Sequence, residues 1–373
     1  MGGREVLRVA CLRLSGKLVS KTPAFIGGGN GGAVWRSLEY IPGSFIRGAF
    51  GVALIKAFCV KPERVNNHEN CEARDGCPYF QLFSEDYKSS NIIFRYGYPE
   101  HVGCPKGGVY HPLLRDFCGH EQNDSVEDFK GLGSLNSWNP CRTYICWGCG
   151  HVASNPINLM RMEADGLVGE TAASKECSFI EVIPPETPFR LDIVLALKVE
   201  SCVDFVLHFL ADALLNGVGR WKRMGFGRFA AKMKAEEIAI DDVKGRAEEI
   251  DSRKFAVRLL SPMAMGEERL LTPSVLLEAA RRGYSRVFHM GKPVLPPVRL
   301  VHKNFLFEKH GGWSLKTERR RRIEPALSAG SVFQFECDEN SRELALALAA
   351  LEYYAVGAYK PHGCGQVVIE HAR

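Results

Sequence analysis

The residues best suited to binding chemistry form a glycine-rich segment at 210–229, LADALLNGVGRWKRMGFGRF. Its glycines surround basic and aromatic side chains, and the positions concerned are Gly217, Gly219, Arg220, Trp221, Lys222, Arg223, Gly225, Gly227 and Arg228. Backbone N–H groups in such turns can face an anion, the cations suit phosphate, and the indole offers a face to a base or ribose. The segment therefore suits a nucleic-acid backbone. A tight helix-to-strand turn with solvated charges fits the same residues equally well.

The surrounding sequence is positively charged and does not match two common nucleotide-binding loops. Between Gly217 and Lys234 there are six basic residues and no acidic one, which makes a local positive strip. The segment is not a Walker A loop, because no GxxxxGK[ST] pattern occurs in the chain. It is not a Rossmann fingerprint either, because here the predicted helix precedes the glycines and a strand follows them.

A second set of chemical residues lies in a cysteine-rich stretch at about 60–155. Cys146 and Cys149 form a CxxC knuckle, a spacing that suits tetrahedral Zn²⁺ because both thiolates can turn toward one ion. The preferred remaining ligands are Cys118 and Cys141, with Cys104 and His151 as substitutes. We expect a structural zinc ion here, because a segment this rich in loops lacks a core of its own. Isolated buried thiols are the alternative.

The glycine-rich segment is repeated, and the repeat predicts the fold. Residues 348–367, LAALEYYAVGAYKPHGCGQV, match 210–229 at an offset of 138, and Gly357, Gly363 and Gly365 fall on the glycines of the first copy. Around each copy the hydrophobic pattern predicts strand, helix, strands, helix and strand, the order of a ferredoxin-like or RRM-like unit. We therefore expect an α+β protein of two tandem units.

The first unit is expected at 1–240. Its predicted elements are a strand at 5–18, a helix that Ser44 caps and that ends at 58, two strands within 179–198, a helix at 203–215 and a strand at 229–233. The cysteine-rich insertion interrupts it at about 60–155. Residues 77–83, CPYFQLF, return to the fold or else help form a second half-site with Cys71.

The second unit is expected at 254–373, after a charged linker at 241–253. Its predicted strands are 255–261, 298–307 and 331–337, and its predicted helices are 272–282 and 341–354. A run of four arginines at 319–322 fits either a solvated loop or a contact to phosphate or to an acidic patch.

Composition describes an ordinary globular chain. Of 373 residues, 46% are hydrophobic and 24% charged, and the net charge of +5 is too small to identify a partner. No export signal and no apolar stretch long enough to span a bilayer is present, so no membrane partner is expected. Thirteen cysteines without an export signal indicate reduced thiols plus a metal site and a cytoplasmic protein.

Three landmarks in order resemble the CRISPR-associated RAMP superfamily. They are IPGSFIRGAFG at 41–51, EVIPPETPFRLDI at 181–193 and GVGRWKRMGFGR at 217–228. In the second half, SAGSVFQFE at 328–336 and VGAYKPHGCGQV at 356–367 resemble the strand before the final helix and the closing glycine loop. The second loop departs from the pattern, because Ala355 replaces its first glycine and Lys360 is its single basic residue before His362.

The resemblance implies a protein that binds CRISPR RNA. Most similar is the two-domain subunit of a type III effector, in particular III-D, that holds the 5′ repeat tag of the guide and nucleates assembly with the other subunits. In that family Ser44 and Arg47 would meet RNA backbone, and both glycine loops, with Lys360, would line the RNA path. The chain is then expected to be non-catalytic.

Two alternatives remain open. One is a metal-independent pre-crRNA endoribonuclease of the same superfamily, for which His208, His302 and His362 offer no recognisable acid/base pair. The other is a zinc-stapled protein-interaction scaffold, which the acid-free strip around Trp221 disfavours.

Overall fold

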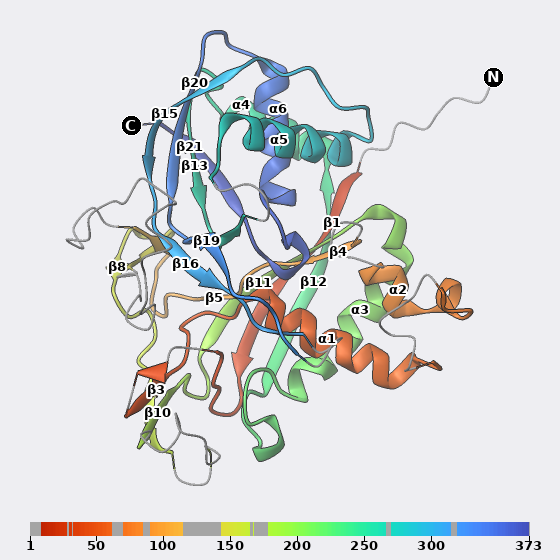
Figure 1. Ribbon diagram of the computed structural model, residues 1–373, viewed down its shortest axis with the longest axis vertical. Coiled ribbons are helices and arrows are strands. Elements are labelled where there is room, and N and C mark those ends of the chain that lie inside the picture. The colour runs from red at the N-terminus through yellow and green to blue at the C-terminus, as the bar shows by residue number, and fades with distance from the viewer. Residues whose placement is uncertain are drawn as a thin grey trace.

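The computed structural model shows two tandem units with the same order of elements. It describes residues 9–27, 30–31, 33–61, 70–84, 90–114, 143–164, 167, 178–265, 270–314 and 319–372. The first unit fills the lower part of Figure 1 and the second unit the upper part. None of the helices described is both long enough and apolar enough to cross a bilayer.

The first unit is a ferredoxin-like sheet covered by helices. Its elements are β1 (Val9–Ser20), α1 (Gly43–Phe58), β4 (Ile92–Phe94), β11 (Pro188–Leu195), α3 (Val203–Leu215) and β12 (Phe229–Ala239). The antiparallel sheet has the order β12-β1-β11-β4, so the fourth strand pairs with the first, and the third with the second. Leu14 and Leu18 of β1 are fully buried on the side that packs against the residues of α1 and α3. This topology confirms the predicted fold of the unit.

The second unit repeats this topology. Its elements are β13 (Lys254–Leu259), α5 (Pro273–Phe288), β15 (Val298–Asn304), β20 (Val332–Cys337), α6 (Arg342–Tyr354) and β21 (Val367–His371). The sheet order is β15-β20-β13-β21, again with the fourth strand beside the first. The Thr272 and Ser341 side chains accept hydrogen bonds from the first turns of α5 and α6, which explains where both helices begin.

Smaller elements decorate both units. In the first unit they are α2 (Pro78–Phe83), β5 (Tyr98–Pro99), a sheet of β2 (Asn30–Gly31), β3 (Val34–Arg36), β10 (Phe179–Val182) and β9 (Met160–Glu163), and a sheet of β6 (Tyr110–Leu113), β7 (Thr143–Cys146) and β8 (Val152–Ala153). In the second they are β14 (Met263–Ala264), β19 (Glu324–Leu327) and β16 (Phe307–His310), and the pair β17 (Trp313–Ser314) and β18 (Arg319–Arg320).

Three expectations from the sequence need correction. The second strand of the first sheet is β4, which lies inside the range assigned to the insertion, whereas β10 belongs to the side sheet. The segment assigned to a linker forms α4 (Ile240–Glu248), whose Val243 is fully buried. Ser44 does not cap the first helix, because the helix already begins at Gly43 after Pro42. The segment 77–83 does return to the fold, since Leu82 and Phe83 of α2 lie in the core of the first unit.

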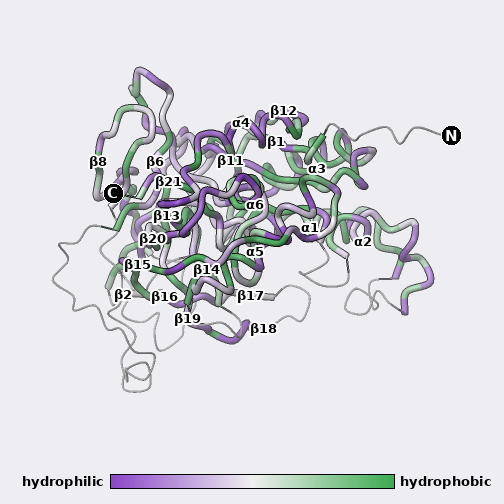
Figure 2. Tube along the Cα trace, turned by 90° about the horizontal axis from the view of Figure 1, so that it is seen from above, coloured by the Kyte–Doolittle hydropathy of each residue, from purple (hydrophilic) through white to green (hydrophobic). Residues whose placement is uncertain are grey.

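The two units share a core. Ala10 and Cys11 of β1 and Ile93 of β4 belong to the same hydrophobic cluster as the buried residues of α5 and α6. Viewed from above, α6 lies in the middle of the molecule (Figure 2). Polar contacts join the units as well, because Tyr98 donates a hydrogen bond to the Leu260 carbonyl. Nη2 of Arg95 donates a hydrogen bond to the Glu352 carbonyl at 2.6 Å.

Candidate nucleic-acid interface and metal centre

The first glycine loop connects α3 to β12 and contains five residues with positive φ, among them Gly217 and Gly219. Trp221, Gly225 and Gly227 have φ of 55°, 88° and 72°. The loop closes on itself where Val218 N–H donates to the Gly227 carbonyl at 2.7 Å. It is fixed to the segment that follows β1, because Gly227 N–H donates to the Pro23 carbonyl at 2.8 Å. A Cβ on Gly227 would lie 1.9 Å from the Val218 carbonyl oxygen, so glycine is required there.

The second glycine loop has the same backbone. Tyr359, Gly363 and Gly365 have φ of 52°, 87° and 71°. The matching bonds are Val356 N–H to the Gly365 carbonyl at 2.8 Å and Gly365 N–H to the Pro262 carbonyl at 2.9 Å. Pro262 therefore corresponds to Pro23. The duplication seen in the sequence thus extends to individual hydrogen bonds. It also includes the segments after β1 and β13 that contain Pro23 and Pro262, which the sequence comparison missed.

The first loop exposes most of its positive charge. Lys222, Arg223 and Arg228 are exposed, and none of them has a carboxylate within salt-bridge distance among the described residues. Burial, with the nearby charge of Lys56 on α1, lowers the pKa of Lys222. Lys56 thus extends the basic strip onto the first helix, which sequence spacing could not show. Lys234, at the far end of the strip, pairs with Glu236.

The two other charged or aromatic side chains of this loop are partly engaged in packing. The Trp221 ring packs at 5.0 Å between centroids against Phe25 and at 5.8 Å against Phe226. The Arg220 guanidinium lies 5.2 Å from the centre of the Trp35 ring. Trp221 is half-buried, so the indole fixes the loop and offers a ligand only part of its surface.

The second loop is turned inward against the first unit. His362 is 5% exposed. A Cβ on Gly363 would meet the Phe94 carbonyl oxygen at 2.5 Å, so this glycine permits β4 to approach. Burial, together with the charges of Arg286 and Arg282, lowers the pKa of Lys360 to about 8. Lys360 is half-buried near the basic residues of α5, whereas Lys222 of the first loop is exposed.

The helix residues assigned to RNA contact lie at this junction. Gly43 begins α1, and a Cβ on it would lie 2.8 Å from the His362 carbonyl oxygen. Ser44 is partly exposed in the first turn. The Arg47 guanidinium stacks over the Phe83 ring at 4.3 Å, and burial lowers its pKa to about 10. Ser44 and Arg47 thus lie beside the second glycine loop.

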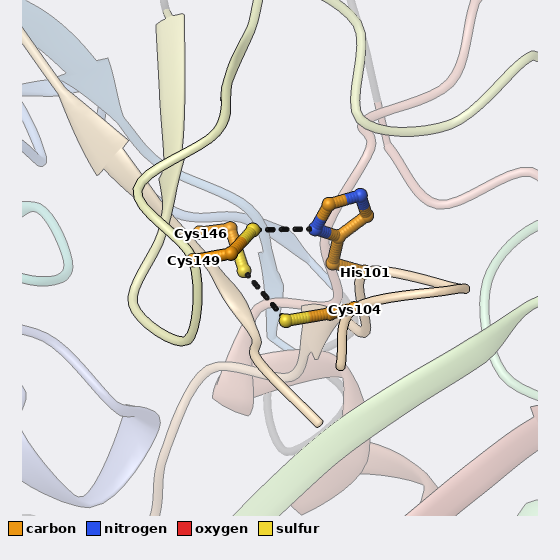
Figure 3. A group of neighbouring side chains, drawn as sticks. All are labelled: His101, Cys104, Cys146 and Cys149. Carbon is orange, nitrogen blue, oxygen red and sulfur yellow. Dashed lines mark hydrogen bonds between the residues drawn. The ribbon is translucent and has the colours of Figure 1, made fainter. Parts of the chain in front are cut away.

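Three cysteines and one histidine, which are common metal ligands, lie close together in the structure. His101, Cys104, Cys146 and Cys149 have their ligand atoms within 4.8 Å of one another (Figure 3). The Cys104 and Cys146 sulfurs are 3.7 Å apart, and the Cys149 sulfur is 3.3 Å from Nδ1 of His101. Two Zn–S bonds of about 2.3 Å at a tetrahedral angle place the sulfurs about 3.8 Å apart. The donor set and its spacing therefore fit a tetrahedral Cys₃His metal site.

Two facing turns hold these ligands. One turn runs from His101 to Cys104, whose N–H donates to the His101 carbonyl at 3.0 Å, and the other from Cys146 to Cys149. Two glycines let the turns approach closely: a Cβ on Gly148 would lie 2.8 Å from the Cys104 sulfur, and one on Gly108, which follows the first turn, 2.3 Å from the Cys146 sulfur. Burial raises the pKa of the Cys104 thiol, but hydrogen bonds from backbone groups of Gly108 and Lys106 outweigh it and leave that pKa lowered. Such a thiol is suited to bind a cation.

The cluster contains part of the ligand set expected from the sequence. Cys146 and Cys149 are in the cluster, and Cys104, a substitute in the sequence prediction, is there too. Cys118 and Cys141 lie outside the described residues. His151 is not a member, since its Nδ1 is bonded to the Tyr110 hydroxyl at 3.0 Å. His101 was missed, and the available signal was the HxxC spacing of His101 and Cys104, which mirrors the CxxC knuckle.

Known proteins resemble this chain only distantly. A family model named AF_1859_N, an N-terminal domain, matches residues 36–100. No curated protein matches. A solved Cas6 product complex has 12% identity and a TM-score of 0.43 over 97% of this chain and 100% of that one. Cas6 of Thermus thermophilus has 10% identity and a TM-score of 0.41 over 97% and 99%. A type III-B Cmr-beta complex bound to cognate target RNA has 12% identity and a TM-score of 0.33 over 61% of each chain.

Proposed function

We propose that this protein is a non-catalytic, RNA-binding subunit of a CRISPR effector. The observation that carries the proposal is the first glycine loop, which projects Lys222, Arg223 and Arg228 into solvent without a described carboxylate partner. Unpaired cations on a rigid turn suit a phosphate backbone, because they gain counter-charges there without losing existing ion pairs. The order of the RAMP-like motifs supports guide RNA as the polynucleotide.

The finer assignment rests on the motif resemblance. We propose a type III complex, with III-D as the subtype, in which this chain holds the 5′ repeat tag in the cytoplasm and contacts neighbouring subunits. Ser44, Arg47 and Lys360 take RNA-contact roles at the second loop in this proposal, and Gly217, Gly219, Arg220 and Trp221 complete the first loop. Burial keeps the pKa of His362 well below its usual value, which makes this histidine a poor proton shuttle at neutral pH and supports a binding role.

We further propose that His101, Cys104, Cys146 and Cys149 hold a structural Zn²⁺. The four ligands leave no open coordination position, which is typical of a structural rather than a catalytic site. The ion would join the turn after β5 to the turn after β7, a region whose own hydrophobic cluster contains three buried residues among those that the structure describes. Metal binding would therefore contribute directly to folding of this region.

RNA binding is tested by charge removal in the first loop. Arg223→Gln should weaken binding of single-stranded repeat RNA and reduce the slope of log K against log salt by about 0.7 per lost phosphate contact. Lys198→Gln, which removes an exposed lysine just before α3, is the matched control and should leave the slope unchanged. Equal slopes for Arg223→Gln and the control would remove this loop from the interface.

The endoribonuclease alternative is tested with the same RNA. Purified protein is incubated with repeat RNA in EDTA, and the products are separated on a denaturing gel. We expect intact RNA. Cleavage at one position would transfer the assignment to a metal-independent nuclease.

Metal analysis tests the zinc proposal. Wild-type protein should contain one zinc per chain, and Cys104→Ser and His101→Ala should lose most of it. Cys118→Ser and Cys141→Ser should retain it, as should Cys202→Ser, a half-buried thiol outside the cluster. Retention in Cys104→Ser with loss in Cys118→Ser would favour the ligand set preferred from the sequence.

A further inference from the structure

Three basic side chains from distant parts of the chain meet where the two units join. Arg47 comes from α1 of the first unit, Arg321 follows β18, and His362 lies in the second glycine loop. Nη2 of Arg321 donates to Nε2 of His362 at 3.3 Å. The α1 backbone at Gly43 lies against the backbone of His362, so the arginine of the next helical turn is close by.

Two nitrogens in this group are buried without a hydrogen-bond partner among the described residues. Because Nε2 of His362 accepts from Arg321, the ring proton is on Nδ1, and Nδ1 is one of the unpartnered atoms. The other is Nε of Arg47. A buried donor without an acceptor lowers the stability of the fold, so two such donors at one seam call for an explanation.

The charged side chains that act most strongly on these donors are basic. Beyond burial, the charges that lower the pKa of His362 are those of Arg47, Arg321 and His310. Burial lowers the pKa of Arg47, Tyr79 raises it, and the charge of Arg321 lowers it further. The nearby carboxylate of Glu308 contributes to raising the pKa values of Tyr96 and Cys364. Arg321 therefore acts on both Arg47 and His362. Among the described residues, no carboxylate is one of the main influences on the pKa of either group.

The start of α1 adds to the positive field. The helix has no side-chain cap and no acidic residue in its first turn. The Phe45 N–H donates to the Pro42 carbonyl, and the remaining N–H groups of the first turn, with the helix dipole, favour an anion at this end. The unpartnered Arg47 and His362 nitrogens are an independent indication of a ligand at the same place.

We propose that the seam formed by Arg47, Arg321, His362 and the start of α1 is a phosphate-binding site that both units build together, and that an RNA phosphodiester occupies it. This inference deepens the proposed function and rests on it. A phosphate group supplies negative charge and several acceptor oxygens to donors that lack them. RNA is favoured over free phosphate because the proposed function already assigns a polynucleotide ligand to this protein through the exposed first loop.

Inorganic phosphate provides a direct test on the full-length protein. The melting temperature should rise with phosphate concentration in wild type, as expected when a ligand binds only the folded state, and chloride of equal ionic strength should have less effect. Arg321→Gln should weaken the apparent affinity about tenfold or more. Arg322→Gln removes the same charge from the neighbouring exposed residue and should behave as wild type. An equal response of Arg321→Gln and Arg322→Gln would overturn the site.

Modified RNA distinguishes the two phosphate sources. Repeat RNAs that carry one neutral methylphosphonate at successive positions are titrated into wild type, Arg321→Gln and Arg322→Gln. At one position the modification should weaken binding to wild type and Arg322→Gln but not further weaken binding to Arg321→Gln. If no position shows this coupling while Arg223→Gln still lowers affinity, the proposed function stands and the seam is not an RNA site. If no variant alters RNA binding, the proposed function itself fails.

Discussion

At the scale of single residues, the left-handed glycines of the loops offer a sharp test of the duplicated backbone. Gly227 has φ of 72°, and an added Cβ would lie 1.9 Å from a carbonyl oxygen. Gly227→Ala should therefore lower the melting temperature by several degrees, because a left-handed non-glycine residue alone costs about 1–3 kcal/mol. Gly245→Ala is the control: this glycine is exposed in α4 with nothing near its Cβ position, and alanine favours helix there. An unchanged melting temperature of the Gly227→Ala variant would contradict the loop geometry.

The site residues differ in how far the sequence could identify them. Cys146 and Cys149 were recognisable because a CxxC turn places both ligands locally. His101 and Cys104 lie more than forty residues earlier, and only the pairing of β6 with β7 brings the two turns together. The approach of Arg47, Arg321 and His362 depends on how two separate units dock. Such proximity leaves no periodic signal in the sequence.

At the scale of elements, the docked second loop and β16 predict a pH dependence. Burial, with a smaller effect from Arg321, lowers the pKa of His310 to about 4, compared with about 6.5 for an unfolded histidine. The unfolded state therefore gains protons first, and this contribution to stability is lost as pH falls from about 6.5 to 4. His310→Gln should show a smaller fall in melting temperature over this range than wild type. His208→Gln, at an exposed histidine on α3, should retain the wild-type profile, and a parallel shift of all three would refute the assignment.

The elements themselves show which parts of the fold were predictable. The helices and the closing strands are long enough for periodicity, and they occur where the repeat places them. Strand β4 has three residues, all buried, so it has no alternation to detect and its neighbours are rich in turn-forming residues. The opposite error occurred at α4, where seven polar or small residues among nine suggested a linker. The Arg246 side chain there binds Glu352 of α6 at 2.9 Å, and buried Val243 completes the contact.

At the scale of the whole molecule, the hydrophobic cluster that contains residues of both units predicts that the two units unfold together. Leu348 of α6 is fully buried in the cluster that also contains Cys11 and Ile93 of the first sheet. Leu348→Ala should cost about 2–5 kcal/mol, as is usual for a buried leucine. Calorimetry should show one transition that moves to lower temperature as a whole, with earlier loss of hydrogen-exchange protection in β1 as well as in β20. Leu54→Ala, in the core of the first unit alone, should move the same single transition. Two separate transitions, with only one shifted by each substitution, would show that the units fold independently and that the seam between them does not couple them.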